Sequence, residues 1–156
     1  MSSLALHELH SGLNASFIEV NGEEAVKEYG NVTAEHAALD ERAGVMDLSF
    51  RGRLCLLGAD RQRFLNGQVT NDVNGLQPGE GCYAALVTAK AKMVSDLNIY
   101  TLENELLLDF EPGQNGRIVQ RLEKYIIADD VQVVDVAPHY GLLSVQGPTS
   151  AEVVSQ

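Results

Sequence analysis

The stretch KAKMVSDLNIY, from Lys90 to Tyr100, has the pattern of a β-strand and carries an acid, Asp96, near its middle. Acids are depleted in strands and are costly to bury unless they are paired. Asp96 is therefore either a carboxylate that works in a pocket or a solvated residue on an outer face. Because successive strand side chains point to opposite faces, two sets are expected. These sets are Met93, Ser95, Leu97 and Ile99 on one face, and Val94, Asp96, Asn98 and Tyr100 on the other.

Other residue types that often do chemistry lack the spacing for it. Cys55 and Cys82 stand alone in apolar segments, without C-x-x-C spacing, so we expect two reduced core thiols. The glycine-rich stretch NGLQPGEG lacks the Gly-Lys-Ser/Thr ending of a phosphate-binding loop. No H-E-x-x-H or comparable ligand spacing occurs among the histidines, so we predict no metal site. The histidines are His7, His10, His36 and His139.

Composition limits the class of protein. The chain has 156 residues, 45% of them hydrophobic and 21% charged, which is ordinary for one globular domain. Its net charge of −11 argues against direct binding to nucleic acid or to an anionic membrane. No apolar run approaches the ~20 residues of a membrane span, and no basic flank marks a signal peptide. We therefore expect a cytoplasmic protein without a membrane partner.

From residue 51 onward the pattern alternates regularly between strands and helices. Helices are predicted over residues 59–70 and from about Gln114 to Ala128, each between strand-like segments. This order favours an α+β fold with a mostly antiparallel sheet, helices on one face, and ferredoxin-like split βαβ elements. The predicted strands cover residues 51–58, 82–89, 92–102, 104–110, 130–138 and 140–147.

The first fifty residues have a different pattern. A short strand ends at an Asn-Gly turn, and the stretch EEAVKEYG predicts a helix that ends at Gly30. A second helix is predicted with Thr33 as its N-cap and Gly44 as its stop. We therefore divide the chain into an N-terminal segment of strand and short helices, residues 1–50, and an α+β domain, residues 51–156. A helix beginning near Pro148 leads us to expect that this domain continues beyond residue 156.

The string FLNGQVTNDVNGLQPGEGCYAALVTAKAKMVSDLNIY resembles the first half of the folate-binding aminomethyltransferase family. This family includes the glycine-cleavage T protein and the YgfZ-type iron–sulfur maintenance proteins. The stretches EYGNVTAEHAALDERAGVMDLS and LLSVQGPTSAEVV extend the resemblance over most of Tyr29 to Val154. The resemblance implies that residues 51–156 are a folate-binding domain, which contributes one wall of a tetrahydrofolate pocket.

Comparison with the T-protein pattern shows departures. The family tyrosine that contacts folate corresponds to Tyr83. The family's paired Asp-Asp corresponds to Ser95 and Asp96, so a serine stands at the position of the family's catalytic acid. Phe50-Arg51 replaces a His-Met pair, and Lys92-Met93 replaces a glycine pair. The stretch AKAKMVSDL instead resembles YgfZ-type members, which lack the catalytic acids.

The resemblance therefore implies a folate-binding protein of the YgfZ type with no catalytic residue. Such a protein would support iron–sulfur enzymes, as its partners, and through them tRNA modification. One alternative is a tetrahydrofolate-dependent aminomethyltransferase that uses Asp96; the other is a non-catalytic interaction domain without a ligand. The implied folate contacts are Tyr83, Met93, Ser95 and Leu97.

Overall fold

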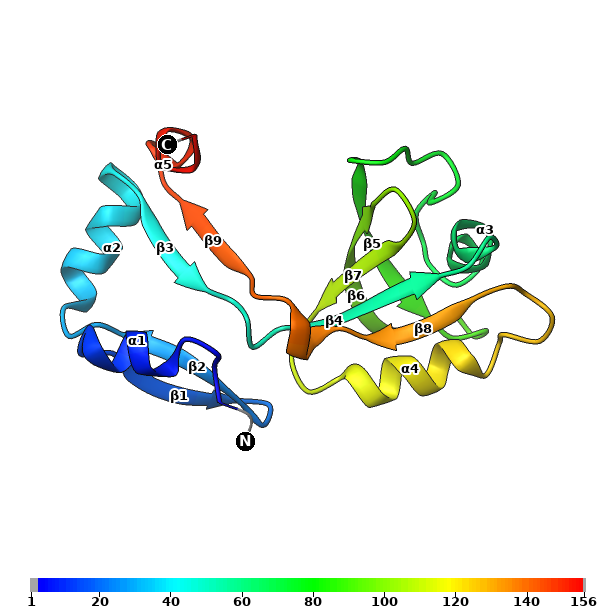
Figure 1. Ribbon diagram of the computed structural model, residues 1–156, viewed down its shortest axis with the longest axis horizontal. Coiled ribbons are helices and arrows are strands. Elements are labelled where there is room, and N and C mark those ends of the chain that lie inside the picture. The colour runs from blue at the N-terminus through cyan, green and yellow to red at the C-terminus, as the bar shows by residue number, and fades with distance from the viewer. Residues whose placement is uncertain (1–2, 156) are drawn as a thin grey trace. The chain divides into compact units, whose positions relative to one another are not determined.

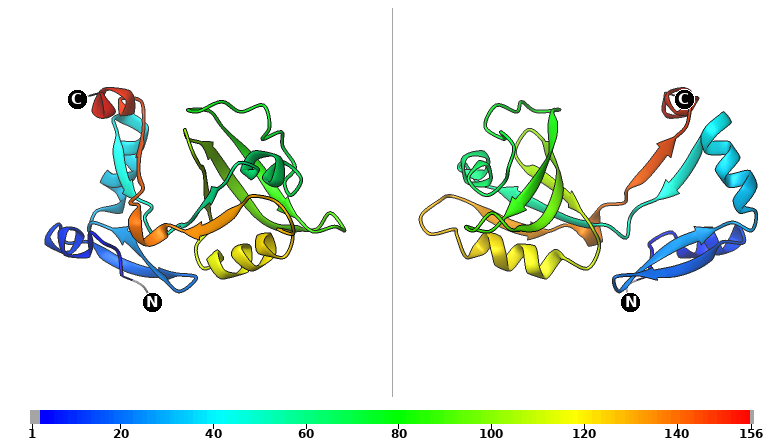
Figure 2. Two further views of the ribbon diagram at one scale, coloured as in Figure 1. Left: turned by 45° about the vertical axis from the view of Figure 1, so that its right-hand side comes forward. Right: turned by 180° about the vertical axis from the view of Figure 1, so that it is seen from behind.

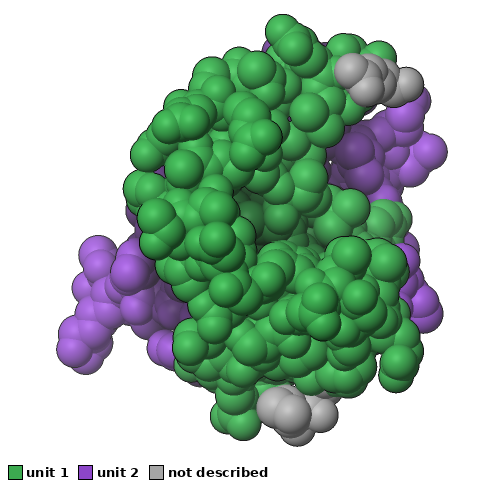
Figure 3. Space-filling view, turned by 90° about the vertical axis from the view of Figure 1, so that its left-hand side faces the viewer, with its two compact units in different colours: residues 1–50, 140–156 green, residues 51–139 purple. Residues whose placement is uncertain are grey.

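The computed structural model describes residues 3–155, and the chain forms two compact units (Figures 1 and 3). Unit 1 combines residues 1–50 with residues 140–156, and unit 2 consists of residues 51–139. Residues 140–156 thus belong with the N-terminal residues, although they follow unit 2 in the sequence. The assignment of a folate-binding role to residues 51–156 stays a prediction.

Unit 2 is built on a five-stranded sheet in which each neighbouring pair of strands is antiparallel. The order across the sheet is β5-β6-β7-β4-β8. In chain order the elements are β4 (Gly52–Leu57), α3 (Arg61–Asn66), β5 (Gly81–Val87), β6 (Met93–Thr101), β7 (Leu106–Phe110), α4 (Asn115–Glu123), β8 (Gln132–Asp135) and the short 3₁₀ helix η1 (Ala137–His139).

The connections of unit 2 form two split βαβ elements. Because β7 is antiparallel to both β4 and β6, strands β4 and β6 run in the same direction. Helix α3 lies in the connection from β4 to β6. In the same way, β7 and β8 are parallel with β4 between them, and α4 connects them. This is the ferredoxin-like arrangement, to which β5 adds an edge strand. The predicted α+β fold is therefore confirmed.

The core of unit 2 lies on one face of this sheet, where α3 and α4 pack (Figure 2). The α4 residues Ile118 and Leu122 are four apart and share one face of the helix. On β6, the buried Leu97 and Ile99 alternate with residues that point away from the core. The buried residues that form this hydrophobic core are Leu54, Leu56, Phe64, Leu65, Val73, Ala84, Leu86, Leu97, Ile99, Leu106, Leu108, Phe110, Ile118 and Leu122.

Within its described residues, 3–50 and 140–155, unit 1 contains two separate two-stranded antiparallel sheets and three helices. Among residues 3–155, no helix is long and apolar enough to cross a membrane. The sheets pair β1 (Ser16–Val20) with β2 (Glu23–Glu28), and β3 (Gly44–Asp47) with β9 (Leu143–Gln146). The helices are α1 (His7–Gly12), α2 (Val32–Glu41) and α5 (Ser150–Val154).

The helix predicted over residues 23–30 is wrong, because residues 23–28 form β2. Asn21 and Gly22 both have positive φ angles, 51° and 89°, which suit a tight hairpin turn. That turn aligns β2 with β1, and the two strands pair from Val20 and Glu23 to Ser16 and Glu28. Pairing across the hairpin therefore overrides the weak helical pattern of the sequence.

The helix predicted after residue 31 is present as α2, but its ends differ from those expected. The Asn31 side chain, not that of Thr33, caps the helix by accepting a hydrogen bond from the Ala34 N–H at 3.1 Å. Glu35 in the first turn accepts hydrogen bonds from the N–H groups of Tyr29 and Asn31. The helix ends at Glu41, before Gly44, and Gly44 already belongs to β3.

The end of β4 depends on a glycine at a close backbone contact. Gly58 has a φ of +101°, and a Cβ there would lie 2.0 Å from the carbonyl oxygen of Asp130. We expect Gly58→Ala to lower the free energy of unfolding by about 3 kcal/mol or more, because the new alanine must adopt a strained φ and the backbone at Asp130 must also move. Gly79→Ala is the matched control, since Gly79 has a φ of +90° and open space around it. It should cost about 1–2 kcal/mol in urea unfolding; equal losses for the two variants would contradict the role of the contact.

Candidate functional site

The face of the unit 2 sheet opposite the core carries a row of polar side chains. Tyr83 on β5 and Asp109 on β7 both stand directly opposite Asn98 on β6, so the three side chains share this face. Asp96, two residues before Asn98, lies on the same face. We call Tyr83, Asp96, Asn98 and Asp109, together with Arg51, the polar face.

The exposed end of the polar face is a tyrosine–carboxylate pair. The Tyr83 hydroxyl donates a hydrogen bond to Oδ2 of Asp96 at 2.9 Å, and the Tyr83 side chain is 62% exposed. The hydrogen bond to Asp96 is the main cause that raises the pKa of the Tyr83 phenol, followed by burial and the charge of Asp96. The phenol therefore stays a hydrogen-bond donor, and it presents its ring to solvent beside a carboxylate.

The other end of the polar face is a buried charged network. Asp109 is almost fully buried and accepts hydrogen bonds from Arg51 Nε at 3.0 and 3.1 Å and from the Asn98 side-chain amide at 3.1 Å. Arg51 also donates to Glu111 at 2.6 Å. Burial alone would lower the pKa of Arg51, but its bonds to Asp109 and Glu111 outweigh burial and raise it. Arg51 thus neutralises Asp109, and Asn98 is held in one orientation beside Asp96.

The four residues implied as folate contacts do not share one face. Ser95 and Leu97 point into the core and are 3% and 1% exposed, and the Ser95 hydroxyl donates to the Asp96 carbonyl oxygen. Tyr83 lies on the polar face. The register between β5 and β6 shifts after Leu86, so the exposed Met93 stands opposite Val87, on the side of Tyr83. The structure therefore groups Tyr83 with Met93 and Asp96, and it separates them from Ser95 and Leu97.

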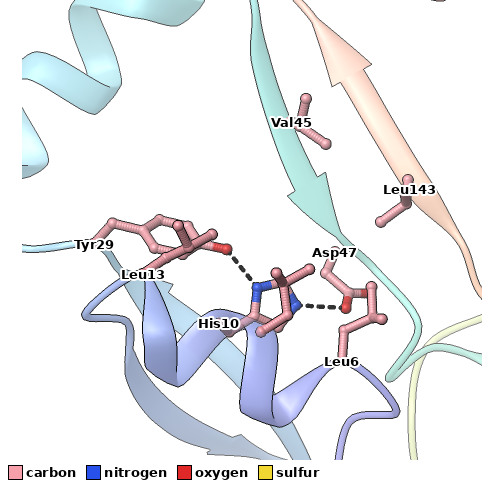
Figure 4. A pocket seen from close by; sticks show the side chains of 8 residues that line it. Leu6, His10, Leu13, Tyr29, Val45, Asp47 and Leu143 are labelled. Carbon is pink, nitrogen blue, oxygen red and sulfur yellow. Dashed lines mark hydrogen bonds and ion pairs between the residues drawn. The ribbon is translucent and has the colours of Figure 1, made fainter.

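Unit 1 contains a second polar cluster that the sequence analysis did not predict. The buried His10 lies between Asp47 and Tyr29: its Nε2 is 2.8 Å from Oδ2 of Asp47, and its Nδ1 is 2.8 Å from the Tyr29 hydroxyl (Figure 4). Since a carboxylate only accepts, His10 donates to Asp47 from Nε2, and its Nδ1 shares the second hydrogen bond with the Tyr29 hydroxyl. These residues are up to 37 positions apart, and no motif spacing connects them.

The charges in this cluster are set by the hydrogen bonds. Burial would raise the pKa of Asp47, but hydrogen bonds from Ser49 and His10 outweigh it and hold the pKa below its usual value. Burial, together with the charges of Asp47 and Glu35, raises the pKa of Tyr29. Asp47 is therefore charged at neutral pH, and Tyr29 stays protonated.

A pocket of about 450 Å³ opens beside this cluster (Figure 4). Its walls are mostly aliphatic, with the side chains of His10, Tyr29 and Asp47 as its polar part. An apolar pocket is suited to contact with apolar groups rather than with charged ones. The other lining residues are Leu6, Leu9, Leu13, Val45 and Leu143.

Nothing among residues 3–155 has the composition of a metal centre, since no group of three His, Cys, Asp or Glu side chains comes together there. The thiols are also poor ligands or nucleophiles. Burial, with a contribution from Glu105, raises the pKa of Cys55 to about 12, and burial also raises the pKa of Cys82. Both cysteines are free. In the sheet, Cys55 on β4 lies opposite Leu107 on β7, and Cys82 on β5 lies opposite Ile99 on β6.

Comparison with known proteins gives the family. The profile of the family described as GCVT N-terminal domain matches residues 6–156, and the chain belongs to that family. The chain is 31% identical to a probable aminomethyltransferase of Halobacterium salinarum, over 96% of this chain and 43% of the relative. It is 30% identical to an aminomethyltransferase of Mycobacterium avium, over 97% of this chain and 41% of the relative.

The fold is also found in a solved structure. The glycine cleavage system aminomethyltransferase T from Bartonella henselae matches with a TM-score of 0.86 and 27% sequence identity. The match covers 99% of this chain and 43% of that protein. The chain thus spans less than half the length of the relatives it matches.

The lowered pKa of Asp47 predicts how the stability of unit 1 depends on pH. A carboxylate with a depressed folded-state pKa stabilises the fold above its unfolded pKa, near 4, and this contribution is lost as the pH falls through the folded value. We expect the wild-type β3–β9 sheet to lose stability below about pH 4. Asp47→Asn should flatten this pH dependence and cost about 2 kcal/mol at pH 7, because the bond from His10 loses its charged acceptor.

Urea titrations at pH 7, 5 and 3, followed by NMR signals of Val45 and Val145, measure this effect. Asp40→Asn is the control, since Asp40 forms an exposed pair with His36 on α2 and should leave the pH dependence unchanged. A wild-type curve as flat as that of Asp47→Asn would contradict the stabilising role of the charged Asp47.

Proposed function

We propose that this chain supplies the tetrahydrofolate-binding sheet of an aminomethyltransferase-type protein. The observation that carries this proposal is the Tyr83–Asp96 pair on the open side of the sheet, where an exposed tyrosine donates a hydrogen bond from its hydroxyl to a carboxylate. Membership of the GCVT N-terminal domain family and similarity to proteins named aminomethyltransferase support it. In this proposal the ligand lies on the side of Asp96 rather than on the side of Ser95, whose side chain is 3% exposed.

The polar face fits a flat heterocycle with polar edges. The exposed Tyr83 ring and Met93 side chain offer apolar contact area, and Asp96 offers carboxylate oxygens beside them. When bound, tetrahydrofolate would supply the amine nitrogens that receive a one-carbon unit. In our proposal Tyr83 and Met93 contact the ligand, Asp96 holds or accepts a proton there, and the buried Ser95 and Leu97 act from behind by fixing the position of β6.

The remaining polar-face residues prepare this surface. Arg51 neutralises Asp109, so the buried carboxylate does not repel a charge on Asp96. The Asn98 amide nitrogen is engaged by Asp109, which leaves the Asn98 carbonyl oxygen to accept a hydrogen bond. Asp96 is thus the one polar-face carboxylate among residues 3–155 that has no cationic side chain bonded to it in the hydrogen bonds and ion pairs described above.

A folate carrier of the YgfZ type is the second candidate. It is favoured by the single acid at Asp96, where the T-protein pattern has two, and by Arg51, where that pattern has methionine. In this case the protein would retain tetrahydrofolate without transferring a group, and iron–sulfur enzymes would be its partners. A third candidate, an interaction domain without a ligand, would need the polar face to be covered by a protein.

Folate binding is tested by calorimetric titration of the chain with tetrahydrofolate. We expect saturable binding, with Tyr83→Ala weakening the affinity about tenfold because the exposed ring is lost. Glu123→Gln, at the exposed end of α4, is the control and should bind as the wild type does. Wild-type affinity in Tyr83→Ala would show that folate binds elsewhere, and no binding by the wild type would remove the self-sufficient folate site.

Transfer chemistry is tested through Asp96. If the chain is a transferase, Asp96→Asn should lower the rate of aminomethyl transfer about 100-fold, because the side chain can no longer take a proton. Its tetrahydrofolate affinity should change much less, since the shape of the side chain is kept. A rate assay with tetrahydrofolate and an aminomethyl donor separates the candidates: saturable folate binding without transfer by the wild type would leave the carrier and exclude the transferase.

A further inference from the structure

Four asparagine–glycine pairs occur in the chain, and this dipeptide loses its side-chain amide more readily than other dipeptides do. The reaction begins when the glycine nitrogen attacks the asparagine amide, and glycine has no side chain that obstructs this attack. In a folded protein the rate depends on whether the backbone can rotate locally and whether the two reacting groups are bonded elsewhere. The pairs are Asn21-Gly22, Asn66-Gly67, Asn74-Gly75 and Asn115-Gly116.

Two of these pairs are held by hydrogen bonds of helices. The Asn66 side-chain oxygen accepts the Val73 N–H at 2.8 Å, and the N–H of Gly67 donates to a carbonyl of α3 at 3.2 Å. Asn115 begins α4, and its side-chain amide donates to both carboxylate oxygens of Asp135, at 2.9 and 2.8 Å. Attack on either asparagine therefore requires these bonds to open first.

A third pair is held by strand pairing. Asn21 and Gly22 form the turn of the β1–β2 hairpin with φ angles of 51° and 89°, and Val20 stands directly opposite Glu23. The attack requires rotation about the backbone of Asn21, and this rotation would separate the paired strand ends. The hairpin therefore protects this pair.

The fourth pair, Asn74-Gly75, is exposed in a turn that a single backbone hydrogen bond closes, from the Leu76 N–H to the Val73 carbonyl at 3.2 Å. The backbone N–H of Asn74 is bonded to Oδ1 of Asp72 at 3.0 Å. Among the hydrogen bonds of residues 3–155, none engages the Asn74 side-chain amide or the Gly75 N–H. Both reacting groups are thus available in the folded chain.

We propose that Asn74 is a site of spontaneous deamidation in the folded protein. The Gly75 nitrogen bonds to Cγ of Asn74, the bond from Cγ to Nδ2 breaks, and ammonia leaves with the proton from the Gly75 nitrogen. Water then opens the resulting succinimide ring at either carbonyl, which leaves aspartate or isoaspartate at this position. No oxidant or reductant is needed, and the proposal does not rest on folate binding.

The modified turn lies in the loop that borders β5. In this loop Thr70 accepts a hydrogen bond from the Ala85 N–H at 2.9 Å, and Asn71 donates to the Tyr83 carbonyl at 3.0 Å. Deamidation adds a carboxylate near Asp72, and isoaspartate also lengthens the backbone inside the turn. The modification therefore changes the charge and the length of a loop that is bonded to β5 at Tyr83 and Ala85.

The test follows all four pairs in one sample. The chain is incubated at pH 8 and digested in acid, and each peptide is measured by mass spectrometry. We expect Asn74 to deamidate about tenfold faster than Asn66 or Asn115, because the hydrogen bonds of those two residues must open first. In urea, which removes the folded structure, the four pairs should react at similar rates. An equal or faster reaction of another pair in the folded chain would overturn the proposal, as would an Asn74 that reacts in urea alone.

A substitution at Gly75 tests the attacking nitrogen. The φ of Gly75 lies outside the left-handed region, and a Cβ there would be 3.5 Å from Oδ2 of Asp72, an ordinary contact. Gly75→Ala should therefore keep the wild-type circular dichroism and slow the reaction of Asn74 about tenfold, because the methyl group obstructs the attack. Gly116→Ala is the control, since open space surrounds Gly116, and it should leave the Asn74 rate unchanged. A wild-type rate at Asn74 in folded Gly75→Ala would contradict the proposed attack.

Discussion

The antiparallel pairing of β6 with both β5 and β7 determines what the sheet of unit 2 can do. Asn98 stands opposite Tyr83 on one side and Asp109 on the other, so this pairing alone gathers the polar side chains of three strands on one face. The other face must then hold the alternating apolar residues, which α3 and α4 cover. A slip of one residue in this register would exchange the two faces and bury Asp96, which the cost of an unpaired buried charge forbids.

The position of α1 in unit 1 depends on a different interaction, the hydrogen bonds between buried carboxylates and the histidines of α1. Asp47 bonds to His10, and the nearly buried Glu24 on β2 bonds to His7 at 2.8 Å. His7 is the main cause that lowers the pKa of Glu24. A six-residue helix is not stable by itself, so these contacts hold α1 in place.

The sequence was sufficient for the elements of unit 2 because its strands alternate with period two and its helices carry apolar residues at helical spacing. It also separated Asp96, Asn98 and Tyr100 from Ser95, Leu97 and Ile99, and the structure has the same two sets. Which set faces the core was not predictable from β6 alone, since that depends on where α3 and α4 pack. Met93 lies on the face opposite to the predicted one, because the register between β5 and β6 shifts at a position that the residue pattern does not predict.

In unit 1 the sequence was less informative for physical reasons. The strand β2 was predicted as a helix because its residues have no strong strand pattern, and its pairing is imposed by the Asn21-Gly22 turn. The cluster of His10, Tyr29 and Asp47 joins three segments that are distant in the chain, so its members looked like ordinary surface or turn residues. Tertiary contacts of this kind become visible when the segments are folded together.

In our proposal the polar face, and not the core side of the sheet, receives the ligand. Side-chain NMR signals recorded during addition of tetrahydrofolate test it most directly, because they distinguish the two faces of one strand. We expect shifts of the Tyr83 ring, the Met93 methyl and the Asn98 amide, with little change in the methyl signals of Leu97 and Ile118. Shifts confined to Leu97 and Ile118, or no shifts at saturating tetrahydrofolate, would contradict it.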